Sequence, residues 1–526
     1  MERLSFIDQV LHKVSTSKLP SLNMQGAMIV DPAKSPFEIN ATVIAEHIAA
    51  RLQGFPLLRK KLVQDPLKMG DLRMVDDEHF DPMNHITFAT LPSPGDKRAL
   101  DRHMGRFSAH ELNPDLPLWQ FEIIEGLEDG RIAVIQKLSH ATMDGMAAMK
   151  MMQSLFDLEP LPPEKPDENF DYGLHAAPSQ LKLLSGATKE NIERYGINMP
   201  KTFLSLSKMA AGGAKNYLKL RFLGDAENAT EPSSDTNDKP TIKAQETSLN
   251  GRISSDKRVM TAAIYKLDEL KRIAKAYDCT INDICLTMAS EALAHYFAGI
   301  DEEVADLFFI MPMSTRTNND KTHGNALTLS KINAHNLIAS IPERLKKIHA
   351  DTSQAKSSRS TKKSSALKLE NPTAMLSPLL VDSLTALLQS VQPWGMIPAP
   401  ANAVMSNVPG SREGAYFAGM PIDYQIPLIP IFHKSALSIG VTSMGNVFSF
   451  GFHACGKTVK ERNVHLFTDG LDFAYKSLLK KMPKPSAVKK STSIKAAAKK
   501  PASKKSTSKK SATKKTVSKS KSVSEK

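Results

Sequence analysis

The residues with the clearest chemical potential lie in one stretch, Ser139-His140-Ala141-Thr142-Met143-Asp144-Gly145. The stretch follows an apolar run typical of a strand, residues 131–138, and precedes a run typical of a helix, residues 146–158. A histidine placed there is a candidate general base, because imidazole takes a proton from a hydroxyl near neutral pH. Asp144 can anchor the loop or orient the ring, and Gly145 permits the positive φ that a sharp turn often needs.

Ser139 is a poor candidate for the nucleophile of a hydrolase. Side chains alternate across a strand, so an extended segment would point Ser139 and His140 to opposite faces. The sequence has no Gly-x-Ser-x-Gly elbow, and no cysteine lies near the stretch. The remaining chemistry is direct transfer, in which a histidine base activates an alcohol that attacks an acyl carbonyl. A structural histidine on an apolar strand face is the alternative.

The charge of this chain is concentrated at one end. The 526 residues carry a formal net charge of +14, and residues 484–526 hold 15 lysines and one glutamate. Residues 1–483 are therefore close to neutral, which argues against a nucleic-acid-binding fold, since such a fold needs a basic face. The lysine-rich tail lacks apolar periodicity and is predicted to be disordered, as a solubilising extension or as a segment that binds anionic lipid.

Three further features restrict the class of protein. Three cysteines in a long chain argue for a reducing compartment and against a disulfide framework. The sequence contains no metal-ligand spacing of Cys and His, no secretory signal pattern and no apolar run of about 18–20 residues that could span a membrane. An apolar stripe at 380–391 is typical of core packing or of an interfacial helix, so membrane contact is expected to be peripheral.

The pattern of apolar residues predicts an α/β protein with four regions: a first α/β domain over 1–165, a helical connector and polar linker over 166–246, a second α/β domain over 247–483, and the tail over 484–526. Strands are predicted at 25–30, 119–125, 132–138 and 307–313, with a hairpin from 436–443 and 447–454. Helices are predicted at 41–52, 267–277 and 282–297. Met146, Met149, Met152 and Phe156 follow a helical spacing that indicates core packing or an acyl-chain wall.

The chain resembles the bacterial wax ester synthase/diacylglycerol acyltransferase family over roughly residues 1–480. That family carries a His-His-x-x-x-Asp-Gly motif, and the stretch that starts at Ser139 is similar to it. Further similar blocks occur in the family's order: Leu4-Ser5-Phe6-Ile7-Asp8, Pro117-Leu118-Trp119, Asn250-Gly251-Arg252-Ile253-Ser254 with Arg258, Asn282-Asp283, 312–316 with Gly324-Asn325, and Ser406-Asn407-Val408-Pro409-Gly410. The departure is Ser139, where the family usually has its first histidine.

The resemblance implies two chloramphenicol-acetyltransferase-like α/β domains joined by a helical connector. It implies transfer of a fatty acyl group from acyl-CoA to a long-chain alcohol or to diacylglycerol, giving wax ester or triacylglycerol, with no metal or prosthetic group. Such a protein is expected to be cytoplasmic and peripherally associated with the inner membrane face or with lipid inclusions.

The resemblance also assigns roles to individual residues. His140 corresponds to the catalytic base, and Asp144 to a structural residue whose partner is Arg59 or Arg316. Gly145, Asn282 and Asn325 are carried over to the substrate site, the two asparagines near the oxyanion, although helix capping and turn formation are their alternative roles. Two other functions stay open: a non-catalytic lipid-binding or lipid-body protein with a degraded motif, and a condensation-type enzyme that uses a carrier-protein thioester.

Overall fold

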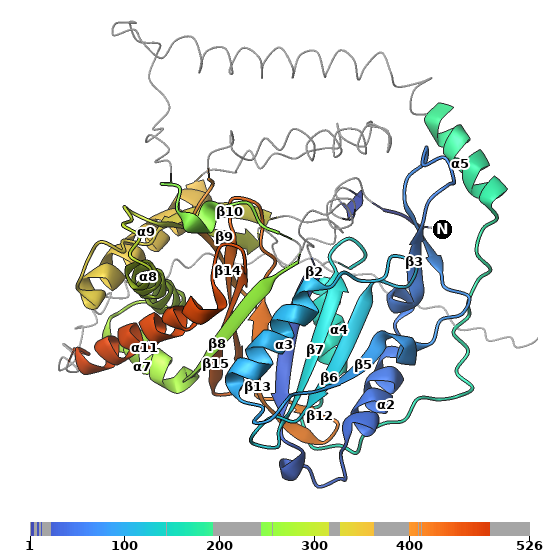
Figure 1. Cartoon of the computed structure of the whole chain (residues 1–526), viewed down its shortest axis with the longest axis horizontal. Coiled ribbons are helices and arrows are strands. Elements are labelled where there is room, and N and C mark those ends of the chain that lie inside the picture. The colour runs from blue at the N-terminus through green and yellow to red at the C-terminus, as the bar shows by residue number, and fades with distance from the viewer. Residues whose placement is uncertain are drawn as a thin grey trace, which may run out of the picture. The chain divides into compact units, whose positions relative to one another are not determined.

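The computed structural model of the chain describes residues 2–4, 8–9, 12, 23–143, 145–192, 244–254, 256–314, 327–361, 399–408, 410–411 and 413–483 (Figure 1). All of these residues belong to one compact unit, Met1–Pro483. Two six-stranded sheets organise the unit, and each is covered by helices. The predicted α/β class is confirmed.

The first sheet has the strand order β12-β13-β2-β7-β6-β5. Its strands are β2 (Asn23–Val30), β5 (Ile86–Thr90), β6 (Trp119–Glu125), β7 (Ile132–Ser139), β12 (Tyr416–Phe417) and β13 (Met420–Leu428). The pairs are antiparallel except β5 with β6. β7 lies inside the sheet, and seven of its eight residues are buried, so helices must cover both of its faces.

Helices cover both faces of the first sheet. α2 (Ala41–Leu52) and α4 (Gly145–Ser154) share a core with Val134 and Leu138 of β7. α3 (Lys97–Ala109) packs on the other face, against Ala133 and Ile135. Both long helices begin at side-chain caps, since Asn40 accepts a hydrogen bond from the Val43 amide and Asp96 accepts one from the Ala99 amide.

A small three-stranded sheet lies beside the first one, with β1 (Glu2–Arg3), β4 (Arg73–Asp76) and β3 (Lys60–Val63) in that order. Leu4, Leu72 and Met74 form its buried cluster together with Ala141, which follows His140 in the chain. The helix α5 (Gln180–Ile192) lies against this sheet. The sheet therefore connects α5 to the loop that carries His140.

The second sheet has the strand order β10-β9-β11-β14-β15-β8. Its strands are β8 (Arg258–Lys266), β9 (Phe308–Ser314), β10 (Leu327–Asn333), β11 (Ala403–Asn407), β14 (Leu437–Met444) and β15 (Val447–Cys455). The helices that share its core are α7 (Leu267–Ala276), α8 (Ile281–Gly299), α9 (Ile341–Thr361) and α11 (His465–Lys480). Phe448, Phe450 and Phe452 of β15 all enter that core, as their shared strand face predicts.

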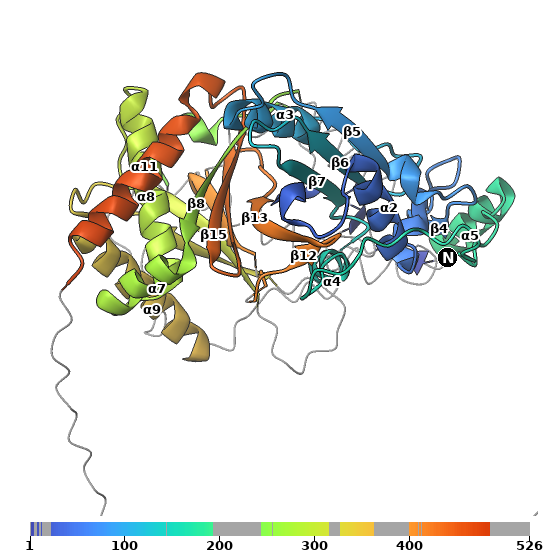
Figure 2. The same cartoon turned by 90° about the horizontal axis from the view of Figure 1, so that it is seen from below.

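A strand from the second half of the chain joins the two sheets. β13 lies between β12 and β2 in the first sheet, and it also packs on β14 and β15 of the second (Figure 2). The approach is close, because a Cβ added to Gly451 would lie 2.1 Å from the Pro427 carbonyl oxygen and one added to Gly440 would lie 2.7 Å from it. Glycine is required at both positions for steric reasons.

Most of the predicted elements are present within one or two residues of their expected ends. The helix after the His140 loop is shorter than predicted, because it ends at Ser154 and not near 158. Asp157 forms an isolated bridge with Tyr416, and Arg51 holds its carboxylate at 2.8 Å. These tertiary contacts extend the backbone where the apolar spacing alone favours a further helical turn.

Candidate active site

The loop after β7 is built around the backbone of Ser139. The Ser139 amide donates to the Leu118 carbonyl at 2.9 Å, so the strand ends in register with the start of β6. The Ser139 carbonyl then accepts hydrogen bonds from the amides of Thr142, at 3.3 Å, and Met143, at 3.2 Å. This tight turn presents His140 at its first position, directly beyond a buried strand.

The Ser139 side chain stabilises the turn. It is 4% exposed, and its Oγ accepts a hydrogen bond from the Ala141 amide at 3.3 Å. The hydroxyl is therefore engaged with the loop backbone and makes no hydrogen bond to the neighbouring imidazole among the described contacts. The Ser139 side chain therefore contributes to the packing and hydrogen bonding of the turn.

His140 is half-buried, and its Nδ1 is buried without a hydrogen-bond partner in the described part of the chain. A buried ring nitrogen usually has a hydrogen-bond partner, so this one stands out, although Nε2 of His47 is also buried without a hydrogen-bond partner among the described residues. The loop around His140 is ordered by backbone contacts, and no described residue forms a hydrogen bond with Nδ1 of the ring.

Some of the apolar residues in and just after the helix that follows the loop are buried in the core, and others are only partly buried. Ala148, Met151 and Leu155 are buried in the first core. Met152 and Phe156 pack against that core while remaining partly exposed. The predicted stripe therefore runs along the edge of the buried face.

Arg59, one of the predicted partners of Asp144, lies at the end of the short helix Pro56–Arg59. Its Nε is 3.8 Å from Oδ1 of Asp76. Burial raises the pKa of Asp76, but hydrogen bonds from His175 and the charge of Arg59 outweigh it and leave that pKa below its ordinary value. Asp76 is thus ionised at neutral pH and is the carboxylate that the described contacts assign to Arg59.

Trp119, in the predicted Pro-Leu-Trp element, positions this corner. Its Nε1 donates to the Leu58 carbonyl at 2.7 Å, and its ring stacks on His85 with centroids 4.3 Å apart. These contacts join the first residue of β6 to the segment that precedes Arg59. The element has a clear structural role one strand away from His140.

The structure describes only two of the other predicted site residues. Gly145 is the first residue of α4, and Asn282 is the second residue of α8, where it is half-buried. The capping of α8 is done by its neighbours, since Thr280 and Asp283 exchange hydrogen bonds. Asp144, Arg316 and Asn325 lie outside the described residues.

The described residues have neither a metal-binding cluster nor a membrane-spanning helix. No group of three or more His, Cys, Asp or Glu side chains there could hold a metal ion. No described helix is long and apolar enough to cross a membrane.

Comparison with known proteins identifies the family. Residues 4–285 match the model of the wax ester synthase/diacylglycerol acyltransferase catalytic domain, which covers more than half of the chain. The chain belongs to the wax ester synthase/diacylglycerol acyltransferase family. Residues 323–478 also match this family's C-terminal domain. As a member, the protein is an O-acyltransferase, and the resemblance predicted from the sequence is confirmed.

Individual relatives agree with the family assignment. A putative diacylglycerol O-acyltransferase of Mycobacterium tuberculosis strain H37Rv is 28% identical over 401 residues, which are 73% of this chain and 79% of the relative. A second protein of that name and strain is 27% identical over 478 residues, 88% of this chain and 92% of its own. The solved wax ester synthase/diacylglycerol acyltransferase from Marinobacter aquaeolei VT8 has the same fold, with a TM-score of 0.62, 23% identity and coverage of 91% of this chain and 98% of its own.

Sequence reasoning missed two polar features of this acyltransferase. One is a hydrogen bond between Ser108 Oγ and His453 Nε2, at 3.1 Å, which joins α3 to β15. The other is a group of basic side chains from β1, β4 and α5. Each joins residues that are far apart in the chain, so no local spacing could have indicated it.

Proposed function

We propose that the protein transfers a fatty acyl group from acyl-CoA to the hydroxyl of a long-chain alcohol or of diacylglycerol, with His140 as the general base. The observation that carries this proposal is the imidazole at the end of β7, which an ordered turn presents and whose Nδ1 makes no hydrogen bond to the described residues. Family membership supports the reaction class.

The proposed reaction is a direct transfer. His140 accepts the hydroxyl proton of the acceptor while its oxygen attacks the thioester carbon of acyl-CoA. The tetrahedral intermediate collapses, the carbon–sulfur bond breaks, and the imidazolium returns the proton to the CoA thiolate. The ester and free CoA are the products, and the base is regenerated without a bound cofactor in the scheme.

The remaining predicted residues have supporting roles in this proposal. Asp144 holds the loop, with Arg59 or Arg316 as its partner, and Gly145 lies beside the substrate at the start of α4. Asn282 and Asn325 stabilise the oxyanion by donating hydrogen bonds. Both substrates carry long acyl or alkyl chains, so the proposal also includes peripheral association with a membrane or lipid-body surface, aided by the lysine-rich tail.

The test is a transfer assay with the full chain. Purified protein receives labelled palmitoyl-CoA with hexadecanol, and separately with diacylglycerol, while CoA release and lipid product are measured. Ester formation that is lost in His140→Ala supports the proposal. Full activity in His140→Ala overturns the role of the base, and no product with either acceptor favours a non-catalytic lipid-binding role or a carrier-protein donor.

A further inference from the structure

One face of α5 carries large apolar side chains in solvent. The helix packs through Leu183, Ala187 and Glu190, which are all buried. On the opposite face Leu181 is 79% exposed and Ile192 is 65% exposed, although both are aliphatic. Together with Leu184, Ser185, Thr188 and Lys189 they form an open, mainly apolar surface on one side of α5. Exposed aliphatic side chains that share one helix face are typical of a surface that contacts an apolar partner.

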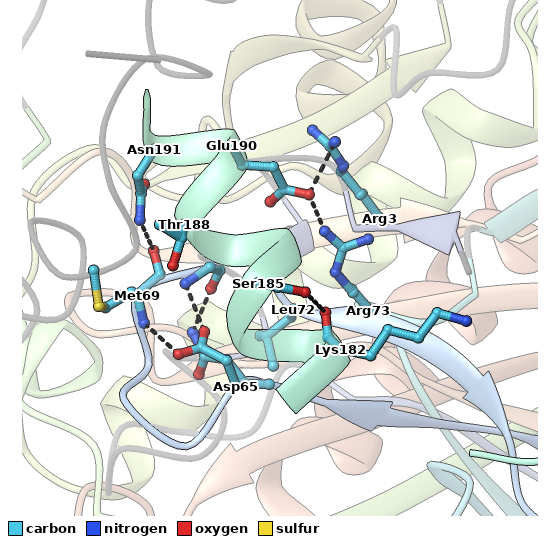
Figure 3. Close-up of polar contacts among 12 residues, drawn as sticks. Arg3, Asp65, Met69, Leu72, Arg73, Lys182, Ser185, Thr188, Glu190 and Asn191 are labelled. Carbon is cyan, nitrogen blue, oxygen red and sulfur yellow. Dashed lines mark hydrogen bonds and ion pairs between the residues drawn. The ribbon is translucent and has the colours of Figure 1, made fainter. Parts of the chain in front are cut away.

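A basic flank borders this apolar face. Lys182 and Lys189 are seven residues apart and therefore lie on the same side of α5, and both are exposed. They line a pocket of about 230 Å³ with Arg3 of β1 and Arg73 of β4. Figure 3 shows Arg3 and Arg73 directed toward the same edge of the helix, at Glu190.

The pocket carries an excess of positive charge. Its one carboxylate, Glu190, is 6% exposed and pairs through Oε1 with Arg3, at 2.9 Å, and with Arg73. Four cations thus face a single anion among the pocket-lining residues. Burial, and next the charge of Arg3, lower the pKa of Arg73, so an added anion would relieve repulsion between the two guanidinium groups.

We propose that this face of α5 docks on a phospholipid bilayer whose surface carries anionic headgroups. Leu181, Leu184 and Ile192 enter the interface between headgroups and acyl chains, and the basic pocket binds headgroup phosphate. A peripheral protein binds such a surface by burying apolar area and by electrostatic attraction to anionic lipid, and the apolar face of α5 with its adjacent cations can provide both. Guanidinium groups also bind phosphate through two parallel hydrogen bonds.

This surface is connected to the His140 loop through the small three-stranded sheet. Leu4 follows Arg3, and Leu72 precedes Arg73, and both leucines pack on Ala141 beside His140. Docking through α5 would thus bring the lipid surface to the small sheet that contacts the catalytic loop. This part of the inference rests on the proposed function, because it assumes that the acceptor is drawn from the bilayer.

Vesicle flotation of the full chain tests the docking itself. Vesicles of phosphatidylcholine alone are compared with vesicles that also contain phosphatidylglycerol. We expect each lysine to contribute about fivefold to partitioning onto anionic vesicles, so Lys182→Ala/Lys189→Ala should lower it about 25-fold. Leu181→Ser/Ile192→Ser should lower it about tenfold. The matched controls are Lys271→Ala/Lys275→Ala, which removes two exposed lysines of α7, and Leu337→Ser, at a leucine that is 62% exposed.

A local probe separates α5 from other lipid-binding segments. An environment-sensitive fluorophore is attached to Leu181→Cys or, as the control, to Leu337→Cys, and labelling of the unsubstituted chain measures the contribution of the half-buried Cys279. A blue shift on anionic vesicles at position 181 alone supports the inference. Equal shifts at both positions, or control variants that lose as much binding as the α5 variants, overturn it. Competition of vesicle binding by free CoA in the wild type, absent in Lys182→Ala/Lys189→Ala, would identify a CoA-phosphate site and also overturn it.

Activity measurements distinguish failure of the docking surface from failure of the proposed function. The α5 variants should lose transfer to diacylglycerol held in vesicles while keeping transfer to an acceptor in detergent micelles. A wild type without activity on either acceptor removes the proposed function, and the binding and fluorescence results then still decide whether α5 docks.

Discussion

Two histidines of this acyltransferase lie close to serines, and they differ in burial and in the hydrogen bonds that their ring nitrogens make. His453 of β15 is buried, and both ring nitrogens are engaged: Nδ1 with the Ile429 carbonyl, at 2.8 Å, and Nε2 with Ser108 Oγ, at 3.1 Å. His140 is half-buried in a turn, and its Nδ1 has no partner among the described residues.

The difference shows why a serine and a histidine in contact are poor evidence for catalysis. Burial, and then the charge of Arg258, lower the pKa of His453 to about 3, so this ring stays neutral at physiological pH. With Nδ1 donating to a carbonyl, Nε2 accepts the hydroxyl proton of Ser108, and the pair joins the two halves of the molecule. The proposed base is instead His140, whose Nδ1 makes no hydrogen bond to the described residues.

The largest expected effect is on activity, at His140. Replacement by alanine removes the proposed base and should lower kcat by about 10²–10⁴-fold. The free energy of unfolding should change little, because the described contacts include no hydrogen bond to the ring. Steady-state kinetics and thermal unfolding measure the two quantities, and a large loss of stability with activity retained would make His140 the structural histidine of the pair.

The reverse result is expected at His453. His453→Leu should lower the free energy of unfolding by about 2 kcal/mol, since it leaves the buried Ser108 hydroxyl without its partner. The unfolded chain binds a proton below pH 6.5 that the folded chain does not bind above about pH 3. The unfolding free energy of the wild type therefore exceeds that of His453→Leu by the full amount above pH 6.5, and this difference shrinks as the pH falls toward 3. Denaturant titrations across that range check it, and a pH-independent difference would contradict the assignment.

A third site sharpens the comparison, because it lies on β7 itself. Lys137 is fully buried and donates to the carbonyls of Phe107 and His110 at the end of α3. Burial lowers its pKa from 10.5 to about 7. Between these pH values the unfolded chain holds a proton that the folded chain has released, so stability rises with pH across the window.

The Lys137→Met variant isolates this contribution. The difference in unfolding free energy between wild type and Lys137→Met should grow with pH, by on the order of 1 kcal/mol per pH unit within the window. Chemical denaturation from neutral to mildly alkaline pH measures it. A flat difference would show that the pKa of Lys137 is the same in the folded and unfolded chains, and one that falls with pH would show that the ammonium is favoured in the folded state; either result contradicts the assignment.

The smallest effect is expected at Ser139. Ser139→Ala removes the hydrogen bond to the Ala141 amide and should lower the free energy of unfolding by about 1 kcal/mol. Activity should stay within about tenfold of the wild type, and Ser139→His should also retain it. Kinetics of both variants beside His140→Ala provide the check, and a loss at position 139 as large as that at His140 would place this side chain in the chemistry.

Much of the molecule could be predicted from local patterns. Apolar alternation placed β6, a continuous apolar run placed β7, and helical spacing placed α2 at its observed bounds. The motif after β7 also makes His140 a candidate base, because residue types and strand–turn–helix context are both visible in the sequence. These features depend on interactions within a few residues, or on a periodicity that follows directly from backbone geometry.

Other features were decided only by the tertiary structure. The end of α4, the insertion of β13 beside β2, the pairing of Ser108 with His453 and the basic pocket around α5 each depend on contacts between distant segments. No periodicity encodes such contacts, because they arise when whole sheets and helices pack. The sequence by itself indicated His140 as the candidate base and the family of the protein. Packing decided that both ring nitrogens of His453 are hydrogen-bonded and that Nδ1 of His140 has no partner among the described residues.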